Sequence, residues 1–272
     1  MTSMYMSSCT KAGEQLARFY CEQPFFKKRI HSYQRCDAFS HIISEFYRLD
    51  ISNIEYPVLA VPDGCIDILF ECSPQQPQAR ICGSTLNSQV VPLKENTPYF
   101  GIRFLPGIIP NFIEVSSEEI LNQCLNFNEL VSNKNWLIEK ISSEGSIDQQ
   151  INLFLNTFSE RLSRKFSTTT QEVLHFIITQ NNEIKIKDLE RLTGYCSRHI
   201  QRMFKHDVGM SIKTFACIIR FQSAIQAMNT SKNLKLSDLT YDLGYNDQAH
   251  FHKEFKKFSQ MSPSDFIKYF KN

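Results

Sequence analysis

The sequence lacks the features that mark membrane, secreted and repetitive proteins. Its 272 residues contain no run of about 18 apolar residues, the length that crosses a membrane. Residues 1–20 contain no basic segment followed by an apolar one, so we expect no signal peptide and a cytoplasmic protein. Only 9 glycines and 10 prolines are present, which excludes collagen-like and low-complexity sequences. At roughly 150 residues per domain, the length predicts two domains.

Cysteine is plentiful, but the patterns that give cysteine a structural role are absent. The nine cysteines include no C-x-x-C pair, and no His pair follows at zinc-finger spacing. Because their number is odd and the expected compartment is reducing, we expect free thiols rather than a disulfide framework. The sequence therefore predicts neither a metal site nor a cofactor. A thiol-reactive sensor remains an alternative, since reactivity depends on a local pKa that the sequence does not give.

Charge is distributed unevenly along the chain. Residues 1–165 carry 15 basic and 18 acidic side chains, a net charge of −3, whereas residues 166–272 carry 15 and 10, a net charge of +5. Five of the seven histidines also lie in the second part. A mildly acidic part followed by a basic part is the arrangement expected if the basic part contacts phosphate.

The first part alternates short apolar runs with turns. Five extended segments are separated by residues typical of turns: 57–61, 65–70, 80–82, 89–93 and 99–104. Three stretches with helical periodicity follow: 116–125, 128–141 and 147–165. We therefore predict an α+β N-terminal domain over residues 1–162, a small β-barrel or sandwich plus helices.

The last of these helical stretches carries an apolar stripe, formed by Ile151, Leu155, Phe158 and Leu162. Packing within its own domain is one interpretation, and a helix that forms a homodimer is the other. The Ser-rich residues 163–170 are the predicted linker. An all-α domain is predicted over residues 171–272.

The second part contains an internal repeat with a period of 50 to 51 residues. Residues 184–189 match 234–239, and the Gly-Tyr dipeptide at Gly194 recurs at Gly244. Each copy has the pattern of a short helix, a turn at Gly and a second helix, which is a helix-turn-helix motif. We predict the two motifs at about 185–205 and 235–258, with a continuous helix between them.

The second helix of each motif has an outward face of polar and basic side chains with no carboxylate. These faces comprise Arg198, Gln201, Arg202 and Lys205 in the first copy, and Gln248, Ala249, His252, Lys253 and Lys256 in the second. Gln and Arg reach base edges bidentately, and Lys suits phosphate. Both faces are therefore predicted to enter the major groove of double-stranded DNA.

Three stretches of the second part carry a family resemblance: 244–258 (GYNDQAHFHKEFKKF), 261–264 (MSPS) and 220–224 (RFQSA). They resemble the DNA-binding domain of the AraC/XylS family of bacterial transcription regulators. The resemblance implies two recognition helices in successive major grooves, a role as an activator and RNA polymerase as a partner. It puts six residues on base-reading positions, namely Arg198, Gln201, Arg202, Gln248, His252 and Lys253. We assign three others to DNA phosphate, namely Ser197, Lys205 and Lys256.

The first part also carries a resemblance, in 59–70 (LAVPDGCIDILF) and 100–107 (FGIRFLPG). These stretches resemble the sensory domain that is fused to one branch of the same family. The resemblance implies a β-rich regulatory domain that binds a small-molecule effector, with helices for homodimerisation. Arg103 and Asp63 are the candidate effector-binding residues, because Arg103 suits an anionic ligand. A buried pair of Arg103 with Asp63 or Asp67 is the alternative.

Four positions depart from the family pattern. Cys196 stands where Ser usually caps the first recognition helix, and Glu190 and Thr240 stand where a small residue usually lies. Gln260 follows the second recognition helix, at the position that Gly209 has in the first copy. We expect Ser197 to act as the cap or the helix start to fray, and Glu190 to reach solvent or find a partner.

Together these patterns predict a sequence-specific DNA-binding transcription regulator without enzymatic activity. Two alternatives stay open. One is a non-specific architectural DNA binder, for which a domain charge of +5 is low. The other is a metal-dependent barrel enzyme fused to a DNA-binding domain, which is disfavoured because His31 and His41 are the only histidines of the first part.

Overall fold

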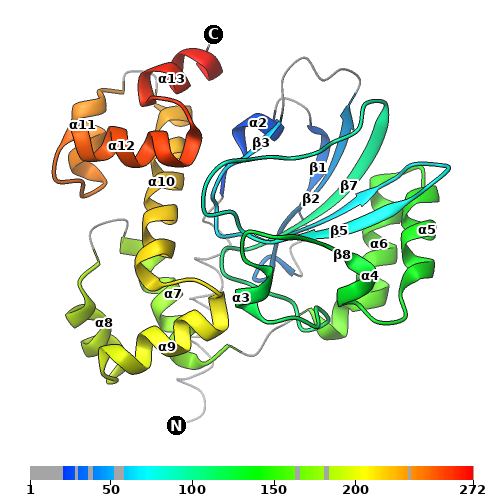
Figure 1. Cartoon of the computed structure of the whole chain (residues 1–272), viewed down its shortest axis with the longest axis horizontal. Coiled ribbons are helices and arrows are strands. Elements are labelled where there is room, and N and C mark those ends of the chain that lie inside the picture. Colours follow the sequence, from blue (N-terminus) through cyan, green and yellow to red (C-terminus); the bar gives the residue numbers. More distant parts are fainter. Residues whose placement is uncertain are drawn as a thin grey trace.

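The computed structural model describes residues 21–27, 30–35, 39–51, 58–162, 166–180, 184–231 and 234–271. Figure 1 shows a β-rich N-terminal domain packed beside a helical C-terminal domain. The predicted α+β domain followed by an all-α domain is confirmed. In the described ranges, no helix combines the length and apolar character needed to cross a membrane.

The N-terminal domain is built on an antiparallel sheet of six strands. Their order is β1 (Ile30–Gln34), β2 (Ile43–Ile51), β7 (Thr97–Phe104), β4 (Asp67–Glu71), β5 (Gln78–Cys82) and β8 (Cys124–Asn126). The outer strands β1 and β8 do not pair with each other, so the strand-rich fold takes the form of an open sheet. A separate pair, β3 (Leu59–Ala60) and β6 (Gln89–Val90), forms a two-stranded sheet. A short helix, α2 (Pro24–Lys27), precedes the strands.

Alternation along the strands gives the six-stranded sheet two different faces. On β7, Phe100 and Ile102 belong to the main core of this domain, whereas Tyr99 packs in a smaller cluster on the opposite side. Helices α4 (Phe127–Leu130), α5 (Asn135–Ser143) and α6 (Ile147–Phe158) contribute to the main core, and α6 continues into the 3-10 turn η2 (Ser159–Arg161). The apolar stripe of residues 151–162 is therefore used inside its own domain.

Strands β5 and β8 are joined by a disulfide between Cys82 and Cys124. The register of the two strands sets these residues directly opposite each other. The expectation of free thiols is wrong for this pair, because strand pairing brings together cysteines that are far apart in the sequence. Cys65 is free and buried, and burial raises the pKa of its thiol, so it is poorly reactive.

The C-terminal domain has seven helices among its described residues. They are α7 (Thr168–Gln180), α8 (Ile186–Thr193), α9 (Ser197–Val208), α10 (Ile212–Thr230), α11 (Leu236–Asp242), α12 (Gln248–Ser259) and α13 (Pro263–Lys271). The starts of α8 and α11 are 50 residues apart, and those of α9 and α12 are 51 residues apart. The structure thus confirms the repeat and its one-residue insertion in the second turn. Helix α7 begins inside the segment predicted as the linker, whose residues 163–165 lie outside the described residues.

The two domains share an apolar interface and several buried hydrogen bonds. Val61 and Leu105 of the N-terminal domain belong to the same core cluster as Phe215 of α10. The buried amide of Gln222, also on α10, accepts from the Glu22 N–H at 2.7 Å and donates to the Pro62 carbonyl at 2.8 Å. The helical domain is therefore held by residues from distant parts of the N-terminal domain.

Candidate nucleic-acid interface

In the first helix-turn-helix motif, α8 and α9 are joined by a turn that Gly194 makes possible. Gly194 has φ +72°, a left-handed conformation that favours glycine, and ends α8. Cys196 occupies the N-cap of α9 but makes no side-chain cap hydrogen bond. Instead, the Glu190 carboxylate of α8 accepts from the Ser197 N–H at 2.8 Å. Glu190 therefore supplies, from across the turn, the side-chain acceptor that Cys196 does not provide at the start of α9.

The second motif reaches the same geometry with different residues. Gly244 has φ +71°, like its counterpart in the first motif. The inserted residue of the turn allows Asp247 to cap α12, by accepting from the His250 N–H at 2.7 Å. Gln260 ends α12 with φ +62°, where the first motif has Gly209 with φ +86°. A non-glycine residue thus holds the left-handed position in the second motif.

An ion pair fixes the second motif to the connecting helix α10. The Arg220 Nη2 lies 3.0 Å from both carboxylate oxygens of Glu254 on α12. Tyr245 donates its hydroxyl to Glu254 at 2.7 Å, and the Arg220 guanidinium lies 4.1 Å from the centre of the Tyr245 ring. The sequence identified Arg220 through the family resemblance but did not indicate its partner. This cluster sets the orientation of α12 relative to α10.

The outward face of α9 is available to a ligand over most of its length. Arg198, Gln201 and Arg202 are exposed, and Ser197 is half-buried at the start of the helix. Lys205 is also exposed, but its Nζ lies 2.7 Å from the Glu118 carboxylate of α3 (Ser117–Ile120) in the N-terminal domain. Among the described residues, Arg198 and Arg202 form no ion pair. The base-reading side chains predicted on α9 therefore share one accessible face.

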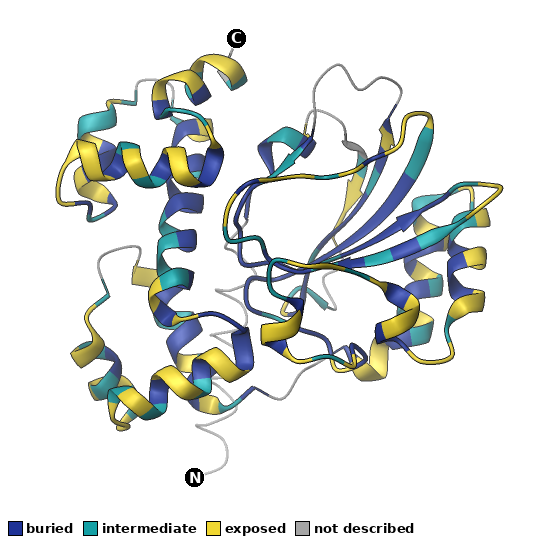
Figure 2. Cartoon of the chain, viewed as in Figure 1, coloured by how far each residue is buried: buried dark blue, intermediate teal, exposed yellow. Residues whose placement is uncertain are grey.

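The outward face of α12 has the same character. Gln248, Lys253 and Lys256 are exposed, whereas His252 is half-buried with its ring edge against Phe251. Neither Lys253 nor Lys256 forms an ion pair with another described residue. In the view of Figure 2, exposed turns of both α9 and α12 are visible on the same side of the molecule.

A hollow of about 600 Å³ lies between the two motifs. Gln201 of α9 and His250 of α12 both line it, and α10 contributes Lys213 and Arg220. Both recognition helices thus border one hollow, with the connecting helix α10 between them. Lys213 was not among the residues predicted from the sequence. It is a basic residue in the first turn of the connecting helix α10, three residues after Met210, and that position was the signal that could have indicated it.

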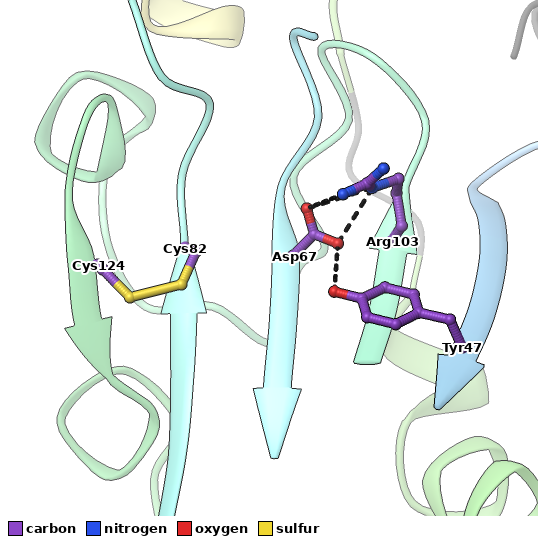
Figure 3. Close-up of a disulfide and its surroundings, with 5 residues drawn as sticks. All are labelled: Tyr47, Asp67, Cys82, Arg103 and Cys124. Carbon is purple, nitrogen blue, oxygen red and sulfur yellow. Dashed lines mark hydrogen bonds and ion pairs between the residues drawn. A yellow bond between two sulfur atoms is a disulfide. The ribbon is translucent and has the colours of Figure 1, made fainter. Parts of the chain in front are cut away.

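Arg103 and Asp63, the predicted effector residues, are both buried and lie 3.8 Å apart, Nη1 to Oδ2. The main partner of Arg103 is Asp67, which accepts from Nε at 3.1 Å and from Nη2 at 3.1 Å, while Tyr47 donates its hydroxyl to Asp67 at 2.9 Å (Figure 3). Although burial lowers the pKa of Arg103, the surrounding carboxylates hold it well above its ordinary value. The pairing of Arg103 with Asp67 is the alternative that the sequence left open, and a role of Arg103 and Asp63 in binding an effector stays a prediction.

Each part of the chain is similar to a known family of domains. Residues 189–269 match a family model described as a helix-turn-helix domain, and residues 31–126 match one described as a domain of unknown function (DUF6597). An uncharacterized HTH-type transcriptional regulator of Haemophilus influenzae is 33% identical over 32% of this chain and 29% of its own length. The lactose operon transcription activator of Staphylococcus xylosus is 27% identical over 49% of this chain and 52% of its own. The chain thus spans no more than about half the length of these relatives.

Among solved structures, a probable AraC family transcriptional regulator from Rhodopseudomonas palustris is 23% identical, with a TM-score of 0.35, over 38% of this chain and 98% of that one. The class that the C-terminal fold and its site define is a DNA-binding domain with two helix-turn-helix motifs. Within that class, residues 189–269 are similar to the helix-turn-helix domain family, and the strand-rich domain before them is similar to DUF6597 over residues 31–126.

Proposed function

We propose that the chain is a sequence-specific transcription regulator that inserts α9 and α12 into two successive major grooves of duplex DNA. The observation that carries this proposal is the common hollow, which Gln201 and His250 border from the two motifs. Recognition helices about 34 Å apart along the DNA match one helical turn. Helix α10 joins the motifs, and the Arg220–Glu254 pair fixes the second motif on it.

The side chains divide into two groups by the chemistry they offer. Base edges are read by Arg198, Gln201 and Arg202 from α9 and by Gln248, His252 and Lys253 from α12, because these groups match base edges in hydrogen bonding. Phosphate is bound by the ammonium groups of Lys205, Lys256 and, in addition, Lys213, and by the hydroxyl of Ser197. For Lys205 to reach phosphate, it must leave Glu118, so DNA binding and domain contact compete for one side chain.

The regulator acts as an activator together with RNA polymerase, with residues 1–162 as its regulatory part and residues 171–272 as its DNA-binding part. The likeness to the lactose operon transcription activator of Staphylococcus xylosus supports this direction of control. A homodimer would use a surface other than the stripe of residues 151–162, because those residues pack in the domain core. A reporter gene downstream of the selected DNA site, transcribed with and without the protein, tests the direction.

Selection of bound DNA from a random pool is the first test, and it is followed by affinity measurements on the selected site. Arg202→Ala should cost about 1–3 kcal/mol of binding free energy and relax the base preference at one position. Lys256→Ala should weaken binding to all sequences alike and reduce the salt dependence by about one ion. If no sequence is enriched, the protein is an architectural binder. If Arg202→Ala weakens all sequences equally, Arg202 contacts phosphate instead.

A further inference from the structure

A cavity lies in the N-terminal domain, on the side of the six-stranded sheet that faces away from α5 and α6. It has a volume of about 100 Å³. Its apolar walls include Phe26, Leu69 and Val91, and its charged wall includes Asp67 and Arg103. We call it the sheet cavity. It belongs to the domain of unknown function and is separate from the DNA-binding faces of α9 and α12.

The charged wall of the sheet cavity has an excess of negative charge. Two carboxylates that line the cavity lie near the single guanidinium of Arg103: Asp67 at 3.1 Å and Asp63 at 3.8 Å. One Arg neutralises one carboxylate, which leaves a formal charge of about −1 in a site where water screens poorly. Burial raises the pKa of the Asp67 carboxyl, the Arg103 guanidinium lowers it, and the neighbouring Asp63 carboxylate raises it further.

A buried hydroxyl in the same wall has no partner. Thr85 lines the sheet cavity, and within the described part of the chain its Oγ1 is buried without a hydrogen bond. Buried polar atoms are nearly always hydrogen-bonded, and one that is not requires an explanation. A ligand with N–H groups supplies both the missing hydrogen bond and the missing positive charge.

We propose that the sheet cavity binds a small organic cation, an ammonium or amidinium group on a short apolar body. The cation lies against Asp67 and Asp63, and its apolar part lies against Phe26, Leu69 and Val91. Because a cavity of about 150 Å³ holds benzene, a cavity of this size takes about four or five non-hydrogen atoms. An anion is excluded by the same carboxylates.

Three segments that line the sheet cavity also bind the DNA-binding domain. Gln23 donates to Asp63 at 2.8 Å, and its neighbour Glu22 is hydrogen-bonded to Gln222 of α10. The segment that includes Thr85 and Gln89 also contains Ser88, whose hydroxyl donates to the Phe258 carbonyl at the end of α12.

The third segment includes Gln123 and follows α3, where the Ser117 hydroxyl donates to the Asp207 carbonyl in α9 at 2.8 Å. A ligand in the sheet cavity thus contacts the segments that hold both recognition helices and the helix between them. We therefore expect its binding to change DNA affinity, an expectation that rests on the proposed function.

The test uses the full chain and three probes of similar size but different charge: n-butylammonium, 1-butanol and butyrate, at matched ionic strength. Calorimetry gives the dissociation constant, and thermal unfolding gives the stabilisation. We expect saturable one-to-one binding of n-butylammonium only, with a rise in Tm of about 3–5 °C at ten times its dissociation constant. Equal binding of 1-butanol, or preferred binding of butyrate, overturns the proposal.

Two variants locate the binding. Asp67→Asn should weaken n-butylammonium at least tenfold, whereas Glu71→Gln, which removes a carboxylate from the same strand outside the cavity, should not. If Asp67→Asn does not fold, Val91→Phe, which fills the cavity without changing charge, must abolish binding. Binding that survives both variants lies elsewhere and overturns the proposal.

DNA affinity at the selected site separates this proposal from the proposed function. A chain that binds its DNA but none of the probes overturns the cavity site alone. A change of at least twofold in DNA affinity with n-butylammonium, absent in Val91→Phe, supports the coupling. Unchanged DNA affinity with a filled cavity overturns the coupling and leaves the binding site in place.

Discussion

The two helix-turn-helix motifs are copies of one unit, but they hold their recognition helices in different ways. In the first, Glu190 caps α9 from the preceding helix; in the second, Asp247 caps α12 from the turn. The position of Glu254 in the second motif, paired with Arg220, is occupied by Met203 in the first. The repeat conserves backbone geometry and apolar spacing, while the polar supports differ.

The motifs also differ in their contacts with the N-terminal domain. Lys205 of α9 is paired with Glu118, whereas its counterpart Lys256 of α12 forms no ion pair among the described residues. Gly209 after α9 packs against the backbone of Ser117, whereas Gln260 after α12 donates to the Ser88 carbonyl at 3.2 Å. The first motif is thus the one whose outward face the N-terminal domain contacts directly, through Lys205.

Arg220→Ala should have the largest effect on the second motif. It leaves the half-buried Glu254 carboxylate without its cation, which costs about 3 kcal/mol of unfolding free energy. Met203→Ala, at the matching place in the first motif, removes a half-buried apolar side chain and should cost less. Urea unfolding of both variants checks the order. Equal losses of unfolding free energy in Arg220→Ala and Met203→Ala would mean that the ion pair does not anchor α12.

Gly209→Ala should have the second-largest effect on stability, and Gly194→Ala is its matched control. Both glycines have positive φ, so an alanine at either position is strained by about 1–2 kcal/mol. A Cβ on Gly209 would lie only 2.2 Å from the Ser117 carbonyl oxygen, whereas one on Gly194 meets open space. Thermal unfolding should therefore show a greater loss for Gly209→Ala, and limited proteolysis should show loosened domains. Equal losses would contradict a tight contact at the end of α9.

Removing either cap should have the third-largest effect, with similar losses of unfolding free energy for the two. Glu190→Ala and Asp247→Ala each remove the side-chain acceptor at the start of one recognition helix, which costs about 1 kcal/mol. Chemical denaturation measures both. If Glu190→Ala loses almost no unfolding free energy, α9 does not need the Glu190 carboxylate as a cap. In that case, adding Cys196→Ser to Glu190→Ala should give no stabilisation.

Glu118→Gln should have the smallest effect, and on DNA affinity rather than folding. The Lys205–Glu118 pair is largely exposed, so releasing Lys205 is worth about 0.4–1 kcal/mol, or a twofold to fivefold gain in affinity for DNA. Glu129→Gln, an exposed carboxylate of α4, is the control for net charge. Fluorescence anisotropy at low and high salt measures the difference, which salt should reduce. No gain over the control would mean that Lys205 does not approach phosphate.

Much of the helical domain was predictable because its signals are local. The period of 50 to 51 residues, the turns at Gly194 and Gly244 and the apolar spacing all depend on neighbouring residues. The strands between residues 57 and 104 were predictable for the same reason. Strand β2 was not, because its mixed aromatic and charged sequence alternates only in the folded sheet, where Phe46 and Tyr47 face different clusters. The base-reading assignments stay predictions.

By itself, the sequence determined that this protein has a strand-rich part and a duplicated helical part with basic outward faces, because periodicity and turn chemistry act over a few residues. Only the tertiary structure decided which charges meet. It paired Arg103 with Asp67, Lys205 with Glu118 and Cys82 with Cys124, and it formed the sheet cavity. These contacts join residues far apart in the chain, so their partners follow from strand register and domain packing, which no local pattern encodes.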